Sequence, residues 1–160
     1  MPNPSASLLH CTQHEVGFVD YLASTDRWDN LKARVLAEKD AKKQAELRRL
    51  ATTSDYALSS VDAVTENGEF IIVDASGTRV VVAHAASKVI LVVGAQKIVK
   101  DMDTAWERVK KYTYETESAR IRKVYEGMSG STLANVFINN SAPFNKGHFH
   151  FVILEEAAGF

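Results

Sequence analysis

The chain is poor in cysteine and proline: Cys11 is its single cysteine, and three prolines occur among 160 residues. One cysteine excludes an intramolecular disulfide and a four-cysteine metal site. No stretch approaches the roughly 20 consecutive apolar residues of a transmembrane helix. The first residues carry neither the positive charge nor the apolar run of a signal peptide. We therefore expect a soluble cytoplasmic protein that does not associate with membranes.

An excess of charge of either sign is also missing. The chain has 19 basic and 20 acidic side chains, a formal net charge of −1. Proteins that bind nucleic acids through the phosphate backbone usually have a basic excess, so no nucleic-acid partner is expected. Apolar residues make up 46% of the chain, enough for one core at this length. A single domain spanning residues 1–160 is the expectation.

Hydrophobic periodicity indicates helices in the first third of the chain and strands after it. Helical spacing is present over 12–24 and 26–52, interrupted by a solvated stretch at 38–43. A short strand is expected at 56–60 and a last one at 149–154. Residues 127–147 are rich in Gly, Ser and Asn and indicate a loop.

A β-hairpin is expected over 63–74, because Asn67-Gly68 between apolar flanks favours a two-residue turn. Residues 70–73 and 88–94 are apolar on both faces, which indicates strands covered on both sides. We predict 70–73 and 89–93 to be adjacent or nearly adjacent in one sheet.

A strand at 88–94 followed by a helix from about 101 to 125 implies a crossover connection. The pattern alone thus predicts a layered α/β domain, and the hairpin makes its sheet mixed. For residues 80–83, β-branched side chains favour a strand, and the alternative is a short buried helix.

Three segments together resemble the lactate-utilization (LUD) domain family: residues 63–69, 73–80 and 88–101. The family carries a similar acidic-Gly turn, a D-x-x-G-N-R segment and a V-G-x-N-K-I-V-x-D segment in this order. The resemblance implies a three-layer α/β/α domain with a mostly parallel sheet, like the ribose-phosphate isomerase and CoA-transferase superfamily. It favours a helix over 80–83. It also implies a role in lactate oxidation or another reaction of a small anionic metabolite.

The chain departs from this family at four points. The family's first helix and strand are expected to be missing, and its Gly-Ser-Thr turn is replaced by residues 3–7. Thr78 and Gln96 stand where the family has Asn. The region 126–146 has no cysteine, unlike that of some relatives, so this chain cannot hold an iron–sulfur cluster there. We predict no cofactor.

The segment from Gly94 to Asp101 leaves the carboxyl end of a buried strand, where open α/β sheets bind ligands. Lys97 and Lys100 could bind an anion there, assisted by the N-terminus of the next helix. The alternative is a strand–helix turn with solvated lysines and Asp101 as its helix cap.

Two further groups of candidates follow from the hairpin region. Glu66 is a candidate acid–base catalyst and Asn67 a candidate ligand contact, although the turn geometry alone explains Asn67. Asp74, Gly77 and Arg79 follow the second hairpin strand, and the planar guanidinium of Arg79 could clamp an anion. The alternative is a structural Asp74–Arg79 pair.

Histidine spacing suggests metal ligands only weakly. His10 and His14 are four residues apart, and His148 and His150 would share a face of a strand. Neither pair comes with an obvious third ligand, so no metal site is predicted. Cys11 fits a small buried thiol better than a nucleophile, because nothing in the sequence shows how it would be activated.

Two functions remain open: an enzyme acting on a small anion, and a non-catalytic module that binds a small molecule or a partner. A pocket assembled from Glu66, Arg79 and Lys97 would favour the enzyme. A domain without its first strand should expose a sheet edge, so we also expect self-association, as a dimer.

Overall fold

The computed structural model describes residues 5–8, 12–140 and 146–160. The strands are β1 (Ser5–Leu8), β2 (Asp29–Asn30), β3 (Tyr56–Ser59), β4 (Ala63–Thr65), β5 (Phe70–Asp74), β6 (Lys88–Gly94), β7 (Ile98–Val99), β8 (Asn135–Asn139) and β9 (Phe149–Leu154). The α-helices are α1 (Thr12–Glu15), α2 (Phe18–Ala23), α3 (Leu31–Ala37), α4 (Ala41–Thr52), α5 (Thr78–Ala85), α6 (Met102–Arg108) and α7 (Tyr114–Val124).

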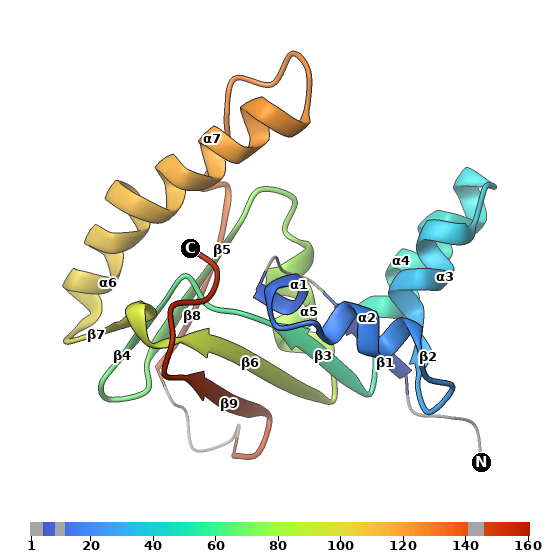
Figure 1. Cartoon of the computed structure of the whole chain (residues 1–160), viewed down its shortest axis with the longest axis horizontal. Coiled ribbons are helices and arrows are strands. Elements are labelled where there is room, and N and C mark those ends of the chain that lie inside the picture. Colours follow the sequence, from blue (N-terminus) through green and yellow to red (C-terminus); the bar gives the residue numbers. More distant parts are fainter. Residues whose placement is uncertain (1–4, 9–11, 141–145) are drawn as a thin grey trace.

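Five strands form a parallel sheet in the order β2-β1-β3-β6-β9 (Figure 1). Every neighbouring pair in it is parallel. The segments 88–94 and 149–154 form strands, as predicted. Strand β1, which lies between β2 and β3, is a strand that the sequence pattern does not predict, because only four residues of mixed polarity form it.

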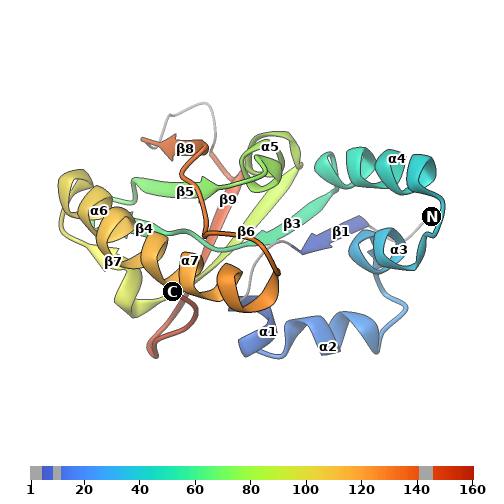
Figure 2. The ribbon, with the colours of Figure 1, turned by 90° about the horizontal axis from the view of Figure 1, so that it is seen from above.

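Helices cover both faces of this sheet (Figure 2). On one face, Leu22 of α2 packs against Leu58 of β3. On the other, Val82 and Ala83 of α5 pack among residues of β3 and β6. The predicted three-layer α/β/α architecture is confirmed. Residues 80–83 are helical, as the family resemblance implies, because one face of α5 is buried against the sheet.

The hairpin belongs to a second sheet, with strand order β7-β4-β5-β8. The prediction that 70–73 and 89–93 share one sheet is therefore wrong, although both segments are buried strands. Their side chains share one core instead, in which Phe70 and Ile72 pack with Val89, Leu91 and Val93. Phe70 of β5 also packs edge-on against Phe149 and Phe151 of β9, with ring centroids 5.0 and 5.6 Å apart. Strands that are apolar on both faces must be covered on both sides, and packing one sheet against the other provides part of this cover.

The hairpin turn has three residues rather than two. Thr65 N–H donates to the Glu69 carbonyl, and Gly68 N–H donates to the Thr65 carbonyl. Gly68 has φ +84°, a left-handed conformation that glycine adopts without steric cost. A turn followed by one left-handed residue is the usual form of a three-residue hairpin loop.

Helix boundaries differ from the sequence pattern where glycine or a cap intervenes. The helix expected over 12–24 breaks at Gly17, which has φ +71°. The region 26–52 divides into α3 and α4, and Asp40 caps α4 by accepting the Lys43 N–H. The helix beginning after Asp101 continues from α6 through a π-helical turn (Val109–Thr113) into α7.

Strand β8 lies inside the region expected to be a loop. It pairs antiparallel with all five residues of β5. Its three consecutive apolar residues, Val136–Ile138, are the strand signal that the surrounding Gly, Ser and Asn obscure. No helix among the described residues is long and apolar enough to cross a membrane.

Candidate functional site

The carboxyl ends of three neighbouring parallel strands bring polar residues to one edge of the sheet. Ser60 and Asp62 follow β3, Lys97 follows β6, and Gly159 lies in the segment after β9, which runs back over this edge (Figure 1). Ligands in open α/β sheets bind at such edges, because the loops leaving neighbouring strands converge there.

Lys97 is completely buried at this edge. Its Nζ donates to Ser60 Oγ at 3.0 Å, and this is its one hydrogen bond with the described residues. Burial lowers the pKa of the Lys97 amine to about 8. Asp62 opposes this shift, and the neighbouring guanidinium groups of Arg108 and Arg79 add to it. An amine with such a pKa exchanges its proton near neutral pH.

Asp62 is the carboxylate that these cations share. Its Oδ2 accepts the Val73 N–H at 2.7 Å and lies 3.2 Å from Arg79 Nη2. Arg108 Nη1 donates to the Asp62 carbonyl oxygen at 2.6 Å, and burial lowers the pKa of Arg108. We call Asp62, Arg79, Lys97 and Arg108 the Asp62 cluster. It holds three basic groups and one carboxylate, and Glu15 is a second carboxylate that acts on Lys97 from outside the cluster. More positive than negative groups favour an additional anion.

Arg79 has an unused donor. Its side chain is 11% exposed, and Nη2 donates to both Asp62 and the Val73 carbonyl. Its Nη1 is buried without a hydrogen-bond partner among the described residues. Asp74 accepts the backbone N–H of Arg79 at 2.9 Å, so Asp74 caps α5 while the guanidinium pairs with Asp62. A buried donor without a partner costs free energy unless a ligand or water occupies it.

A cavity of about 490 Å³ opens beside Asp62 and Arg79. Its wall combines basic, acidic and apolar side chains from α2, α3 and α7. On this wall, Arg120 makes a bidentate pair with Glu117 at 2.7 Å. The remaining lining residues include His14, Lys32, Asp74, Thr113, Tyr114, Ser131, Leu133 and Phe160. A few polar groups among apolar ones are typical of small-molecule sites.

The segment after β9 covers Lys97. Gln96 Nε2 donates to the carbonyls of Ala158 at 3.0 Å and Gly159 at 2.9 Å, and Glu15 accepts the Gly159 N–H at 2.7 Å. Gly159 has φ +64°, and a Cβ there would overlap Thr12 Oγ1 and lie 3.0 Å from Lys97 Nζ. Only glycine fits at this point over the amine.

Not every predicted residue belongs to this site. Arg79 and Lys97 meet in the Asp62 cluster, and Asp74 lines the cavity. Glu66 and Asn67 are exposed in the hairpin turn and do not line the cavity. Lys100 is exposed, and Asp101 caps α6 by accepting the Thr104 N–H. Of the three residues Glu66, Arg79 and Lys97, only Arg79 therefore lines this cavity.

The two glycines predicted to contact a ligand are Gly77 and Gly94. Neither lines the cavity beside Arg79. Gly94 packs so closely on Ala158 that a Cβ there would overlap the Ala158 nitrogen. Gly77 precedes α5 with φ +81°.

The sequence pattern predicts neither Asp62 nor Arg108 as a site residue. The signal for Asp62 is a polar residue directly after a strand, whereas Arg108 reaches the site only through the packing of α6.

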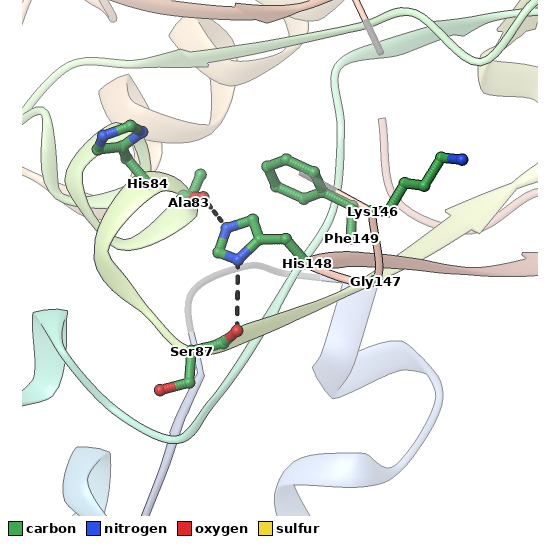
Figure 3. Close-up of a pocket in the computed structure, with 7 residues that line it drawn as sticks. All are labelled: Ala83, His84, Ser87, Lys146, Gly147, His148 and Phe149. Carbon is green, nitrogen blue, oxygen red and sulfur yellow. Dashed lines mark hydrogen bonds between the residues drawn. The ribbon is translucent and has the colours of Figure 1, made fainter. Parts of the chain in front are cut away.

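His148, in the turn before β9, and His150, in β9, lie at the opposite end of the sheet. His148 lines a cavity of about 260 Å³, where its ring nitrogens face the carbonyls of Ala83 at 2.8 Å and Ser87 at 3.3 Å (Figure 3). His150 contacts the Gly147 carbonyl. The described residues contain no group of three or more potential metal ligands. His10 and Cys11 lie outside the described residues.

A family model described as the LUD domain matches residues 7–154 of the 160-residue chain. No curated protein matches the chain. The matched range includes all four residues of the Asp62 cluster and both sheets except the first two residues of β1.

Proposed function

The chain belongs to the LUD domain family, and on this premise we propose that the cavity beside Arg79 binds a small anionic metabolite. The observation that carries the proposal is the buried Nη1 of Arg79, which has no hydrogen-bond partner among the described residues. The family resemblance favours a hydroxy acid or oxo acid, such as those of lactate oxidation. A carboxylate would accept the hydrogen bond that Nη1 leaves unused.

Each residue of the Asp62 cluster has a distinct role in this proposal. Arg79 contacts the anion directly. Lys97 and Arg108 supply positive charge from behind, and Asp62 orients Arg79 through the 3.2 Å ion pair. The Lys97 amine is completely buried and does not line the cavity, so it acts on the bound anion through its charge and not by contact.

The second candidate is a binding module without catalysis. The exposure of Glu66 favours it, because the carboxylate expected to serve as acid or base does not line the cavity. Turnover of a bound hydroxy acid or oxo acid by the wild-type protein would identify the enzyme. Binding without turnover would identify the module.

The test of binding is a thermal-shift screen with lactate, pyruvate, sugar phosphates and CoA esters, followed by calorimetry. A ligand that binds only the native state must raise the melting temperature. Arg79→Lys keeps the charge beside Asp62 and removes Nη1, so affinity should fall about ten- to a hundredfold. Arg34→Lys, in the exposed pair with Asp29, is the matched control. Equal affinities in both variants would contradict the proposal.

We also propose that the protein acts in the cytoplasm and forms a dimer through β9. This strand is at the edge of the parallel sheet and exposes Phe151, Val152 and Ile153 by 37, 45 and 47%. Edge strands with exposed apolar residues tend to pair with another chain. Sedimentation should show a dimer that Val152→Lys dissociates. A wild-type monomer at high concentration would refute it.

A further inference from the structure

A second cavity, of about 440 Å³, lies between α4 and α5, and we call it the α4–α5 groove. Its apolar wall includes Val35 of α3, Ala51 of α4 and Val80–Val82 of α5. Val81 is 50% exposed there. None of the twelve residues of α4 is buried, so this helix rests on the domain without inserting a side chain into the core. The groove therefore exposes apolar surface that a ligand could cover.

The polar lining of the groove has one sign of charge. Lys32, Arg48 and Arg49 line it, and no acidic side chain does. Arg48 Nη2 donates to Gln44 at 3.3 Å, whereas the Arg49 guanidinium makes no hydrogen bond or ion pair with any described residue. Three cations without a carboxylate are conspicuous in a chain with a formal net charge of −1. Such a surface attracts anions.

We infer that the α4–α5 groove binds an aliphatic carboxylate, with its chain on Val80 and Val81 and its carboxylate on Arg49. The apolar wall accounts for the chain, because covering exposed apolar surface is favourable in proportion to its area. The planar guanidinium accounts for the carboxylate, which it can bind with two parallel hydrogen bonds. This site is separate from the cavity beside Arg79, because the two share only Lys32 among their lining residues.

The test is calorimetric titration of the full chain with sodium decanoate, decanol and inorganic phosphate. Decanoate should bind at least about tenfold more tightly than either of the others, because only it uses both the apolar wall and the cations. Equal binding of decanol would show that the cations contribute nothing. Equal binding of phosphate would show a simple anion site. Absence of decanoate binding would also refute the inference.

Variants then locate the site. Arg49→Gln and Val81→Glu should each weaken decanoate binding about ten- to a hundredfold. Lys42→Gln and Leu50→Glu are the matched controls, because both residues are exposed on α4 and neither lines the groove. Arg79→Lys should leave decanoate affinity unchanged, whatever it does to small anions. If Arg79→Lys weakens decanoate binding and Arg49→Gln does not, decanoate occupies the other cavity and the inference is wrong.

Discussion

Two regions of this domain concentrate positive charge, and they are built in opposite ways. In the Asp62 cluster, Lys97 is fully buried and Arg79 nearly so, around a carboxylate that is itself 3% exposed. In the α4–α5 groove, Arg48 and Arg49 are exposed and no acidic residue lines the wall. Buried charge needs a counter-charge within the fold, whereas exposed charge is stabilised by water. Substitutions in the first region should therefore change stability, and those in the second should change binding alone.

The largest effect is expected from Asp62→Asn. Asparagine keeps an acceptor for the Val73 N–H but removes the negative charge beside three cations. Breaking a buried ion pair on one side costs about 3–5 kcal/mol of the free energy of unfolding. Urea unfolding monitored by circular dichroism measures it.

The control for this variant is Asp29→Asn, which removes an exposed pair with Arg34. Exposed pairs contribute about 1 kcal/mol or less. If the two variants lose the same free energy, the buried cluster does not depend on its carboxylate and the contrast between the regions fails.

Lys97 gives the second prediction, a dependence of stability on pH. Its pKa falls from 10.5 in the unfolded chain to about 8 in the folded one. Below that pH the amine is protonated in both states. Between the two values the unfolded state holds a proton that the folded state has released, so stability rises with pH, by at most about 1.4 kcal/mol per unit.

Unfolding free energies from neutral pH to about pH 10 in wild type and Lys97→Met isolate this contribution. The difference between the two proteins should shift in favour of wild type as pH rises. Lys100→Met, at an exposed position, should follow wild type. A constant difference between wild type and Lys97→Met would show that the amine keeps its ordinary pKa.

The third prediction concerns the segment that covers Lys97. Gly94 has φ −71°, so alanine fits its backbone, but the new Cβ would overlap the Ala158 nitrogen. Overpacking of this kind costs about 1–3 kcal/mol. Displacement of the covering segment should also make Lys97 reactive toward amine-labelling reagents, measured by mass spectrometry of peptides.

Gly127→Ala is the comparison for Gly94→Ala. Gly127 has φ +79° and open space around it, so alanine adds backbone strain of about 1–2 kcal/mol without contact with the cluster. Labelling of Lys97 should be unchanged in this variant. Equal labelling in both variants would mean that Ala158 does not protect the amine.

The same contrast explains what the sequence could predict. Strand β6 contains a continuous apolar run, β9 consists of apolar residues apart from His150, and Arg79 and Lys97 follow strand ends, so local pattern suffices for them. Pairing of Asp62 with Arg108 depends on contacts across 46 residues, which no local pattern contains. The sequence pattern does not reveal strand β8, because its flanks are polar. It does not reveal the second sheet either, because no local feature shows whether two strands belong to one sheet or to two.

The smallest effect on stability is expected in the groove. The Arg49 guanidinium makes no hydrogen bond or ion pair with any described residue, and α4 buries none of its side chains. Surface substitutions away from caps and cores usually change the free energy of unfolding by no more than about 0.5 kcal/mol. Arg49→Gln should therefore unfold with the wild-type midpoint in urea, even where decanoate binding is lost. A clear loss of stability would show that Arg49 holds α4 on the domain. The charges of the α4–α5 groove would then stabilise the fold as those of the Asp62 cluster do, and the difference between the two regions would disappear.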